Sequence, residues 1–269
     1  IGVGAYTSAI LVTRLGFSFW LSLPVAGLVA ALAGMIIGIP SLRIKGLYLC
    51  IATLAAQFIF EFIFIHWESM TKGITGIHVP NPQIGGFEFK TEKEFYWITL
   101  VFVVLAVGYA RNLIRSRMGR AFVAIRDRDL SAEIMGINLL RYKLSAFAIS
   151  SFYAGVAGAL WVTFLKVVTP DHFPFILSIQ YLAMIIVGGL GSILGSIFGA
   201  VFITLTPEVL SHFSDIVKLY VPGYDEIFVP MKEVIFGLLI VLFLVFEPLG
   251  LAEIWNRIKA FFRLWPFTY

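Results

Sequence analysis

The stretch GRAFVAIRDRDLSAEIMGINLLRYKLSAF, residues 119–147, is a polar island in an otherwise apolar chain. It and the few residues before it contain eight bases and three acids: Arg111, Arg115, Arg117, Arg120, Arg126, Arg128, Arg141, Lys143, Asp127, Asp129 and Glu133. Of the whole chain, 59% is hydrophobic and only 13% is charged, whereas roughly 25% of residues are charged in soluble domains. The composition therefore predicts a protein that lies in a bilayer.

Uncharged or nearly uncharged runs recur on both sides of the island. About 20 helical residues are needed to cross the hydrocarbon core, and suitable runs occupy 17–39, 46–65, 95–110, 144–165 and 231–249. Residues 1–13 resemble the end of another helix, and we expect an N-terminal piece with at least half a helix before Ile1. These runs predict an all-α, polytopic transmembrane bundle that forms a single domain over residues 1–269, incomplete at its N-terminus.

The positive charges predict the orientation of this bundle. Short loops rich in Lys and Arg stay on the cytoplasmic side, so we expect residues 114–143, and the turn that carries Arg43 and Lys45, to be cytoplasmic. The loop 66–94 then faces out, and its mixed charges and flanking Trp67 and Trp97 fit that side. Arg14 is the single exception to this scheme.

Residues 172–207 contain no Asp, Glu, Lys or Arg, yet they are too few for two ordinary spans and a turn. We predict two short or discontinuous helices with a hinge near Gly188, Gly189 and Gly191. Broken helices of this kind often line transport pathways. A tight helical hairpin packed for assembly is the alternative, and the sequence leaves both open.

Small residues recur at every fourth position, in three series: Ala26, Ala30, Gly34 and Gly38; Ser151, Gly155 and Ala159; Gly191, Gly195 and Gly199. Such stripes let helices approach closely in lipid, so we interpret them as packing surfaces rather than as substrate contacts.

Few ionisable residues fall within the predicted spans. Gln57 and Glu61 share one helix face and are candidates for the solute pathway. No buried carboxylate or histidine relay can be assembled, so any driving force must come from elsewhere.

The sequence also argues against several other function classes. It contains no GxxxxGK[ST] motif, no metal-ligand spacing and no convincing Ser/His/Asp arrangement, which argues against an enzyme and against a bound cofactor. The bases flank membrane helices without an aromatic stacking platform, so nucleic acid is not an expected partner. A transporter driven by another protein, a passive channel and a non-transporting scaffold remain as hypotheses.

Two cytoplasmic elements can be predicted in more detail. Asp129 is a suitable N-cap and Gly136 a suitable stop for a short helix. Its apolar residues suggest docking into a partner, although a basic loop on anionic lipid is the alternative. Near the C-terminus, residues 253–265 place Trp255, Ile258, Phe262 and Trp265 on one face, which predicts an interfacial amphipathic helix with an anchoring role.

The segment GRAFVAIRDRDLSAEIMGINLLRYKLSAFAISSFYAGVAGAL, residues 119–160, resembles the signature of membrane permease subunits of branched-chain amino acid ABC importers. The resemblance continues through IGVGAYTSAIL (1–11), LRIKGLYLCIATLA (42–55), SMTKGITGI (69–77), TPDHFPFILSIQYLAMIIVGGLGSILGSIFGA (169–200) and FEPLGL (246–251). In one respect the chain departs from the family: relatives often carry an acid near the middle of the helix that here holds Gln57 and Phe58.

The resemblance implies a function and a set of partners. Residues 114–143 would form the coupling segment that contacts a separate cytoplasmic ATPase, which itself binds ATP and Mg²⁺. A periplasmic solute-binding protein would deliver branched-chain amino acids to the loops 66–94 and 166–174, and a second permease subunit would complete a heterodimer in the bacterial inner membrane. Relatives that carry urea, short amides or aromatic acids widen the range of substrates, and an ATP-independent channel is the other alternative. The residues implied in coupling are Arg120, Arg126, Asp127, Glu133, Gly136, Ile137 and Asn138.

Overall fold

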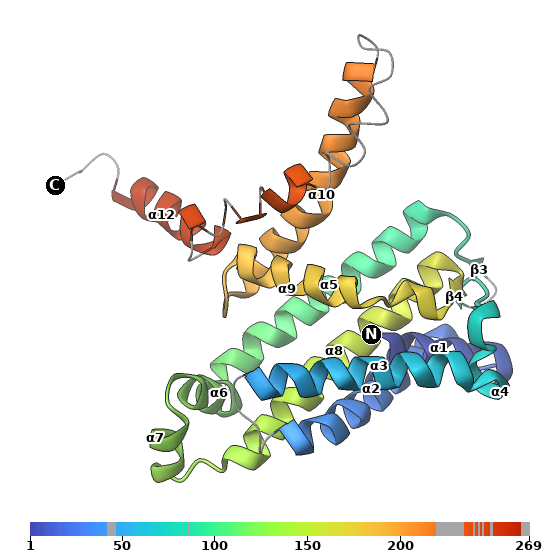
Figure 1. Ribbon diagram of the computed structural model, residues 1–269, viewed down its shortest axis with the longest axis horizontal. Coiled ribbons are helices and arrows are strands. Elements are labelled where there is room, and N and C mark those ends of the chain that lie inside the picture. Colours follow the sequence, from blue (N-terminus) through green and yellow to red (C-terminus); the bar gives the residue numbers. More distant parts are fainter. Residues whose placement is uncertain are drawn as a thin grey trace. The chain divides into compact units, whose positions relative to one another are not determined.

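The computed structural model describes residues 1–41, 47–84, 87–218, 234–238, 240–241, 243, 245–247 and 250–264. The chain divides into two compact units, Ile1–Pro174 and Phe175–Tyr269, and each is described by itself (Figure 1). Both units are almost entirely helical in their described parts, as predicted. The turn with Arg43 and Lys45 lies outside the described residues, as does much of the run 231–249.

The first unit contains five long helices: α1 (Gly2–Arg14), α2 (Phe19–Ser41), α3 (Leu47–His66), α5 (Glu92–Arg115) and α8 (Leu139–Leu165). Their positions confirm the predicted runs. Across the described residues of the whole chain, five helices are long and apolar enough to cross a membrane. A sixth span is possible if α3 and the segment after it, bent by 70°, count as one.

Small residues form the closest helix contacts of the first unit, which confirms the packing interpretation of the stripes. A Cβ atom built on Gly34 of α2 would overlap the Ser151 hydroxyl of α8. A Cβ on Gly155 of α8 would lie 2.5 Å from the Cβ of Ala30 and 2.8 Å from the carbonyl oxygen of Ala26. Because lipid gives helices no hydrophobic reason to associate, this close approach is what holds α2 and α8 together.

Hydrogen bonds also join helices inside the first unit. The hydroxyls of Ser8 on α1 and Ser22 on α2 are fully buried and lie 2.9 Å apart. The phenol of Tyr153 on α8 donates to the carbonyl of Ala106 on α5 at 3.0 Å. These bonds satisfy groups that lipid cannot solvate.

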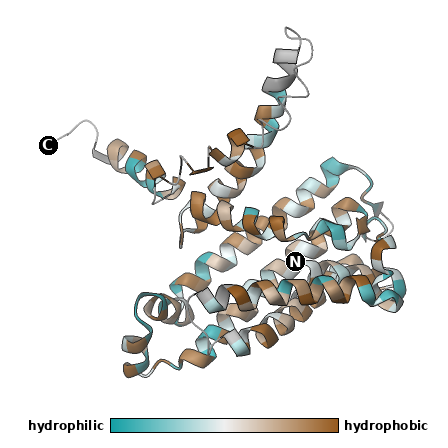
Figure 2. Cartoon of the chain, viewed as in Figure 1, coloured by the Kyte–Doolittle hydropathy of each residue, from teal (hydrophilic) through white to brown (hydrophobic). Residues whose placement is uncertain are grey.

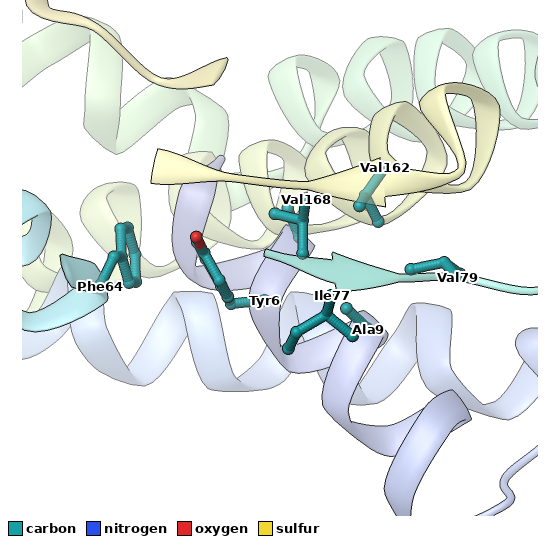
Figure 3. Packing of buried hydrophobic residues seen from close by; sticks show 8 residues of the cluster. Tyr6, Ala9, Phe64, Ile77, Val79, Val162 and Val168 are labelled. Carbon is teal, nitrogen blue, oxygen red and sulfur yellow. The ribbon is translucent and has the colours of Figure 1, made fainter. Parts of the chain in front are cut away.

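A strand pair joins the two predicted outer loops, 66–94 and 166–174. The loop 66–94 contains α4 (Glu68–Thr71), η1 (Gly73–Thr75) and the strands β1 (Ile77–His78), β2 (Gln83–Ile84) and β3 (Phe87–Glu88). β1 pairs antiparallel with β4 (Val167–Val168), which is followed by η2 (Pro170–His172). Figure 3 shows the side chains of this strand pair packed with others from the helices around them: Tyr6, Ala9, Phe64, Ile77, Val79, Val162 and Val168. The two predicted outer loops therefore form one layer.

The first unit has its two polar regions at opposite ends. The joined loops lie at one end, and the short helices between α5 and α8 lie at the other (Figure 1). Figure 2 shows hydrophilic residues gathered at these ends and hydrophobic residues along the helices between them. This separation agrees with the prediction that the two regions face opposite sides of a membrane.

The second unit contains α9 (Phe175–Gly188), α10 (Ile193–Lys218) and α12 (Leu251–Leu264). The chain breaks between α9 and α10 at 189–192, where we predicted a hinge. α9 is short, with 14 residues. The second helix is discontinuous from the first, as predicted, but is not short: α10 has 26 residues and continues through Pro207. Pro207 removes one backbone donor, which a membrane helix tolerates. Glu208 follows it within the same helix.

The C-terminal helix begins two residues before the predicted boundary at 253. Gly250 has a φ of 80°, and its carbonyl accepts from the Glu253 amide at 3.0 Å, so the helix starts at Leu251. Trp265 lies outside the described residues.

Close packing at Gly155 gives a first testable prediction. Gly155→Leu should overpack the α2–α8 contact and lower stability by about 1–3 kcal/mol, measured as a fall in the thermal unfolding temperature of the purified protein. Gly108→Leu on α5 is the matched control, since a Cβ there meets no atom within 4 Å. Equal losses for the two variants would contradict the packing argument.

Candidate functional site

The predicted coupling segment consists of two short helices, α6 (Arg117–Asp127) and α7 (Asp129–Ile134). α5 ends at Arg115, and Ser116 makes the turn into α6: its hydroxyl donates to the Leu113 carbonyl at 2.7 Å and accepts from the Gly119 amide at 3.3 Å. A Cβ on Gly119 would overlap the carbonyl oxygens of Leu113 and Ile114, so only glycine allows α6 to fold back this tightly.

Apolar contacts hold α6 against α8. Ala121 is buried, and the rings of Phe122 and Tyr142 meet edge to face at 6.2 Å. The bases of α6 remain at the surface, where the Arg120 guanidinium donates to the Arg115 carbonyl at 3.0 Å and Arg126 pairs with Asp127 at 3.1 Å. Exposed pairs of this kind contribute at most about 1 kcal/mol each, so packing fixes the position of α6.

α7 ends in the way that its glycine predicts. The Gly136 amide donates to the Glu133 carbonyl at 2.9 Å, and the Ile137 amide donates to the Ala132 carbonyl at 3.0 Å. With a φ of 84° at Gly136, these two bonds form a Schellman motif. The start of the helix differs from the prediction by one residue: Arg128 is the N-cap, and Asp129 is the first helical residue.

The end of α7 leads directly into α8. The Asn138 side chain accepts from the Arg141 amide at 3.0 Å and so caps α8. Lys143 on α8 lies 3.9 Å from Asp129 on α7. α7 is thus fixed to the helix that makes the closest contacts in the first unit.

α7 presents an apolar surface to its surroundings. Leu130 is 69% exposed, Ile134 88% and Met135 80%. Beside them lies a pocket of about 550 Å³. Its lining includes four of the residues implied in coupling and consists of Asp129, Glu133, Gly136, Ile137, Asn138, Leu139, Leu140 and Lys143. Within the described part of the chain, the Glu133 carboxylate has no hydrogen-bond or ion-pair partner. We use the name coupling surface for the three exposed apolar side chains together with this pocket.

The glycine-rich break of the second unit is tightly packed. A Cβ on Gly188 would overlap the Gly195 carbonyl, and one on Gly199 would overlap the Met184 carbonyl. The Gly189 amide donates to Ile185 and Ile186, and the Ser192 hydroxyl accepts from the Gly195 amide at 3.0 Å. These contacts favour the tight-hairpin interpretation, and a hinge role for Gly188, Gly189 and Gly191 stays a prediction.

The chain was compared with known proteins. The family model described as branched-chain amino acid transport system / permease component matches residues 1–244. The chain is 32% identical to the high-affinity branched-chain amino acid transport system permease protein LivM of Escherichia coli K12, over 93% of this chain and 61% of LivM. It is 26% identical to a probable branched-chain amino acid transport permease protein LivH of Methanocaldococcus jannaschii, over 96% and 82%. No solved structure matches the chain.

The chain belongs to the branched-chain amino acid permease family. It spans about 61% of the length of the LivM relatives that it matches. With its apolar helices, this permease is a multi-pass membrane protein. A more distant relative is the autoinducer 2 import system permease protein LsrC of Salmonella typhi, at 26% identity over 84% of this chain and 63% of LsrC.

The structure gathers some of the predicted site residues of this permease and leaves others apart. Glu133, Gly136, Ile137 and Asn138 meet at the coupling surface. Arg120, Arg126 and Asp127 lie on α6, outside the lining of the pocket. Gln57 and Glu61 are half-buried on one face of α3, one turn apart, and neither lines the pocket beside α7.

Sequence reasoning missed α6 and the role of Gly119. The signal was present: Ser116 followed three residues later by Gly119, with apolar Ala121 and Phe122 beyond, has the spacing of a capped helix. It also missed Leu139, Leu140 and Lys143, which begin α8 and line the pocket.

The left-handed backbone of Gly136 gives a second prediction. Gly136→Val should loosen the end of α7 by about 1–2 kcal/mol, because a side chain disfavours positive φ. The measurement is hydrogen exchange at the Ile137 amide, which should quicken roughly 5- to 30-fold. Gly136→Asn should change exchange less, since Asn tolerates this conformation. If Val and Asn behave alike, the backbone conformation is not what ends α7.

Proposed function

We propose that this permease is a subunit of an ABC importer that moves branched-chain amino acids across the bacterial inner membrane. A separate cytoplasmic ATPase would bind ATP and Mg²⁺ and contact the coupling surface. The observation that carries the proposal is the exposure of Leu130, Ile134 and Met135 on a helix fixed to α8. LivM, a relative at 32% identity, is named as a high-affinity branched-chain amino acid transport permease, which supports the substrate class.

The exposed side chains favour a protein partner over a lipid surface. Complete burial of a Leu, Ile or Met side chain is worth about 1.5–3 kcal/mol, so three of them can anchor a docked helix. The charges on α7 itself are Asp129 and Glu133, which an anionic leaflet would repel. The nearest bases lie outside α7: on α6, at Arg128 and, after α7, at Arg141 and Lys143 of α8.

The connection from α7 to α8 suggests how a push would travel. The Asn138 cap and the Lys143–Asp129 pair join α7 to the start of α8. α8 in turn packs on α2 and α1 through residues that leave no space for independent movement. A displacement of α7 would therefore move these helices together, as rigid-body alternating access requires.

The outer loops suit a delivery partner. β1 and β4 join the loops 66–94 and 166–174 into one layer at the end of the first unit opposite to α7. A periplasmic solute-binding protein would contact this layer, and a second permease subunit would complete the pathway.

Charge substitution on α7 tests the coupling role. The double variant Ile134→Asp, Met135→Asp should abolish co-purification of the ATPase and reduce ATP-driven leucine uptake at least tenfold, because two carboxylates would have to be buried. Ile74→Asp is the control for co-purification of the ATPase, since Ile74 is 72% exposed in the outer loop, at the end of the first unit opposite to α7. Uptake that survives the double substitution would exclude α7 as the coupling element.

A reconstitution separates the importer from an ATP-independent channel or facilitator. In proteoliposomes that contain this permease, its ATPase, the second permease and the binding protein, leucine should accumulate against its gradient only when ATP is supplied to the ATPase side. Downhill flux through this permease alone, without ATP, would favour a channel. Competition by urea, short amides, aromatic acids or autoinducer 2 would identify a related solute instead.

A further inference from the structure

α12 contacts α10, and its predicted role as an interfacial anchor stays a prediction. The rings of Trp255 and Phe198 meet edge to face at 5.8 Å. α10 and α12 can be followed in Figure 1. Between them lies a groove of about 760 Å³ with an apolar lining: Phe198, Val201, Phe202, Leu205, Thr206, Val209, Leu210, Leu251, Ile254, Trp255 and Ile258. This volume is in the range of sites that bind small molecules, roughly 300–1,000 Å³.

The side chain of Lys259 lies beside a residue that lines this groove. The ammonium of Lys259 lies 5.5 Å from the centre of the Trp255 ring, which lines the groove. Arg257 is already paired, at 2.9 Å with Glu247 and at 3.9 Å with Glu253. Lys259 has no acidic partner among the described residues, so its charge is available to a ligand.

We propose that the groove between α10 and α12 binds an anionic phospholipid, with an acyl chain along α10 and the phosphate at Lys259. α10 is a candidate membrane span, and its lining residues extend from Phe198 to Leu210. A lipid acyl chain in the groove would therefore lie along the axis of α10. α12 carries exposed Phe261 and Phe262 beside Lys259, the combination found on helices that lie in the headgroup region. A phosphate would pair with the ammonium of Lys259, whereas an apolar helix surface would match the lining alone.

The groove lies on the helix that begins beside the α9–α10 break. Gly250, which precedes α12, lies against Gly188 and Gly189, so that a Cβ built on it would be 2.8 Å from the Gly188 carbonyl carbon. The ligand would thus hold the helix whose N-terminus covers the α9–α10 break. The site does not depend on which solute this permease carries.

Fluorescence quenching tests the proposal with the full chain in phosphatidylcholine nanodiscs. The probes are dioleoyl phosphatidylglycerol and phosphatidylcholine with brominated chains, and the contribution of Trp255 is the difference between the native chain and Trp255→Phe. Phosphatidylglycerol should quench Trp255 at about one-fifth of the mole fraction that phosphatidylcholine requires, the effect expected of one lysine near an anionic surface.

Two variants and one control locate the effect. Lys259→Gln should remove the preference for phosphatidylglycerol, and Val201→Phe should fill the groove and remove quenching by both lipids. Lys93→Gln, which changes an exposed lysine outside the groove, should leave the preference intact. The proposal is wrong if both lipids quench equally in the native chain, if Lys259→Gln keeps the preference, or if neither lipid reaches Trp255 because protein covers it. Displacement by soluble glycerol phosphate would also overturn it, since the site would then bind the anion alone.

Discussion

The close approach of helix backbones is the constraint on which the rest of this structure depends. In a bilayer, moving an apolar side chain from lipid into a helix contact gives no hydrophobic free energy, because lipid tails are equally apolar. Helices therefore associate where small residues let their backbones touch. α8 makes such contacts with α2 through Ser151 and Gly155, and with α1 through Gly155, which faces Gly4. The second unit meets the same constraint with Gly188, Gly195 and Gly199 between α9 and α10.

This packing explains why a small exposed helix can matter to the whole first unit. α7 is only six residues long and is anchored by a Schellman motif, a cap at Asn138 and one ion pair to α8. None of these contacts is strong alone. They join α7 to α8, which itself packs closely on α1 and α2.

Local rules predicted much of the fold, and the misses share a physical cause. The apolar runs within residues 17–165, the break near Gly189 and the stop at Gly136 depend on neighbours in sequence, and the structure confirms them. The β1–β4 pair joins Ile77 to Val168, and the sharp turn into α6 depends on the approach of Gly119 to the carbonyls of α5. Contacts that depend on the approach of separate segments leave no periodic pattern in the sequence.

The coupling surface was predictable in part for the same reason. Its glycine and its apolar residues could be identified locally, but the pocket could not, because it forms only when α7 and the start of α8 lie side by side. The length of α10 was not predictable from the uncharged run, because the run ends at Pro207 whereas the helix continues through it. A membrane helix tolerates an internal proline.

The break between α9 and α10 constrains what can move in this permease. A flexible hinge needs unpaired backbone and free space, yet here the Gly189 amide is bonded, Ser192 caps α10, and Gly250 covers Gly188 and Gly189. Bending at this point would have to separate three backbone segments that are in contact. Movement of α9, α10 and the start of α12 as one body would leave those contacts intact. The observed contacts of the glycines therefore favour a compact body, in which movement is expected at the edges, where side chains rather than backbones meet.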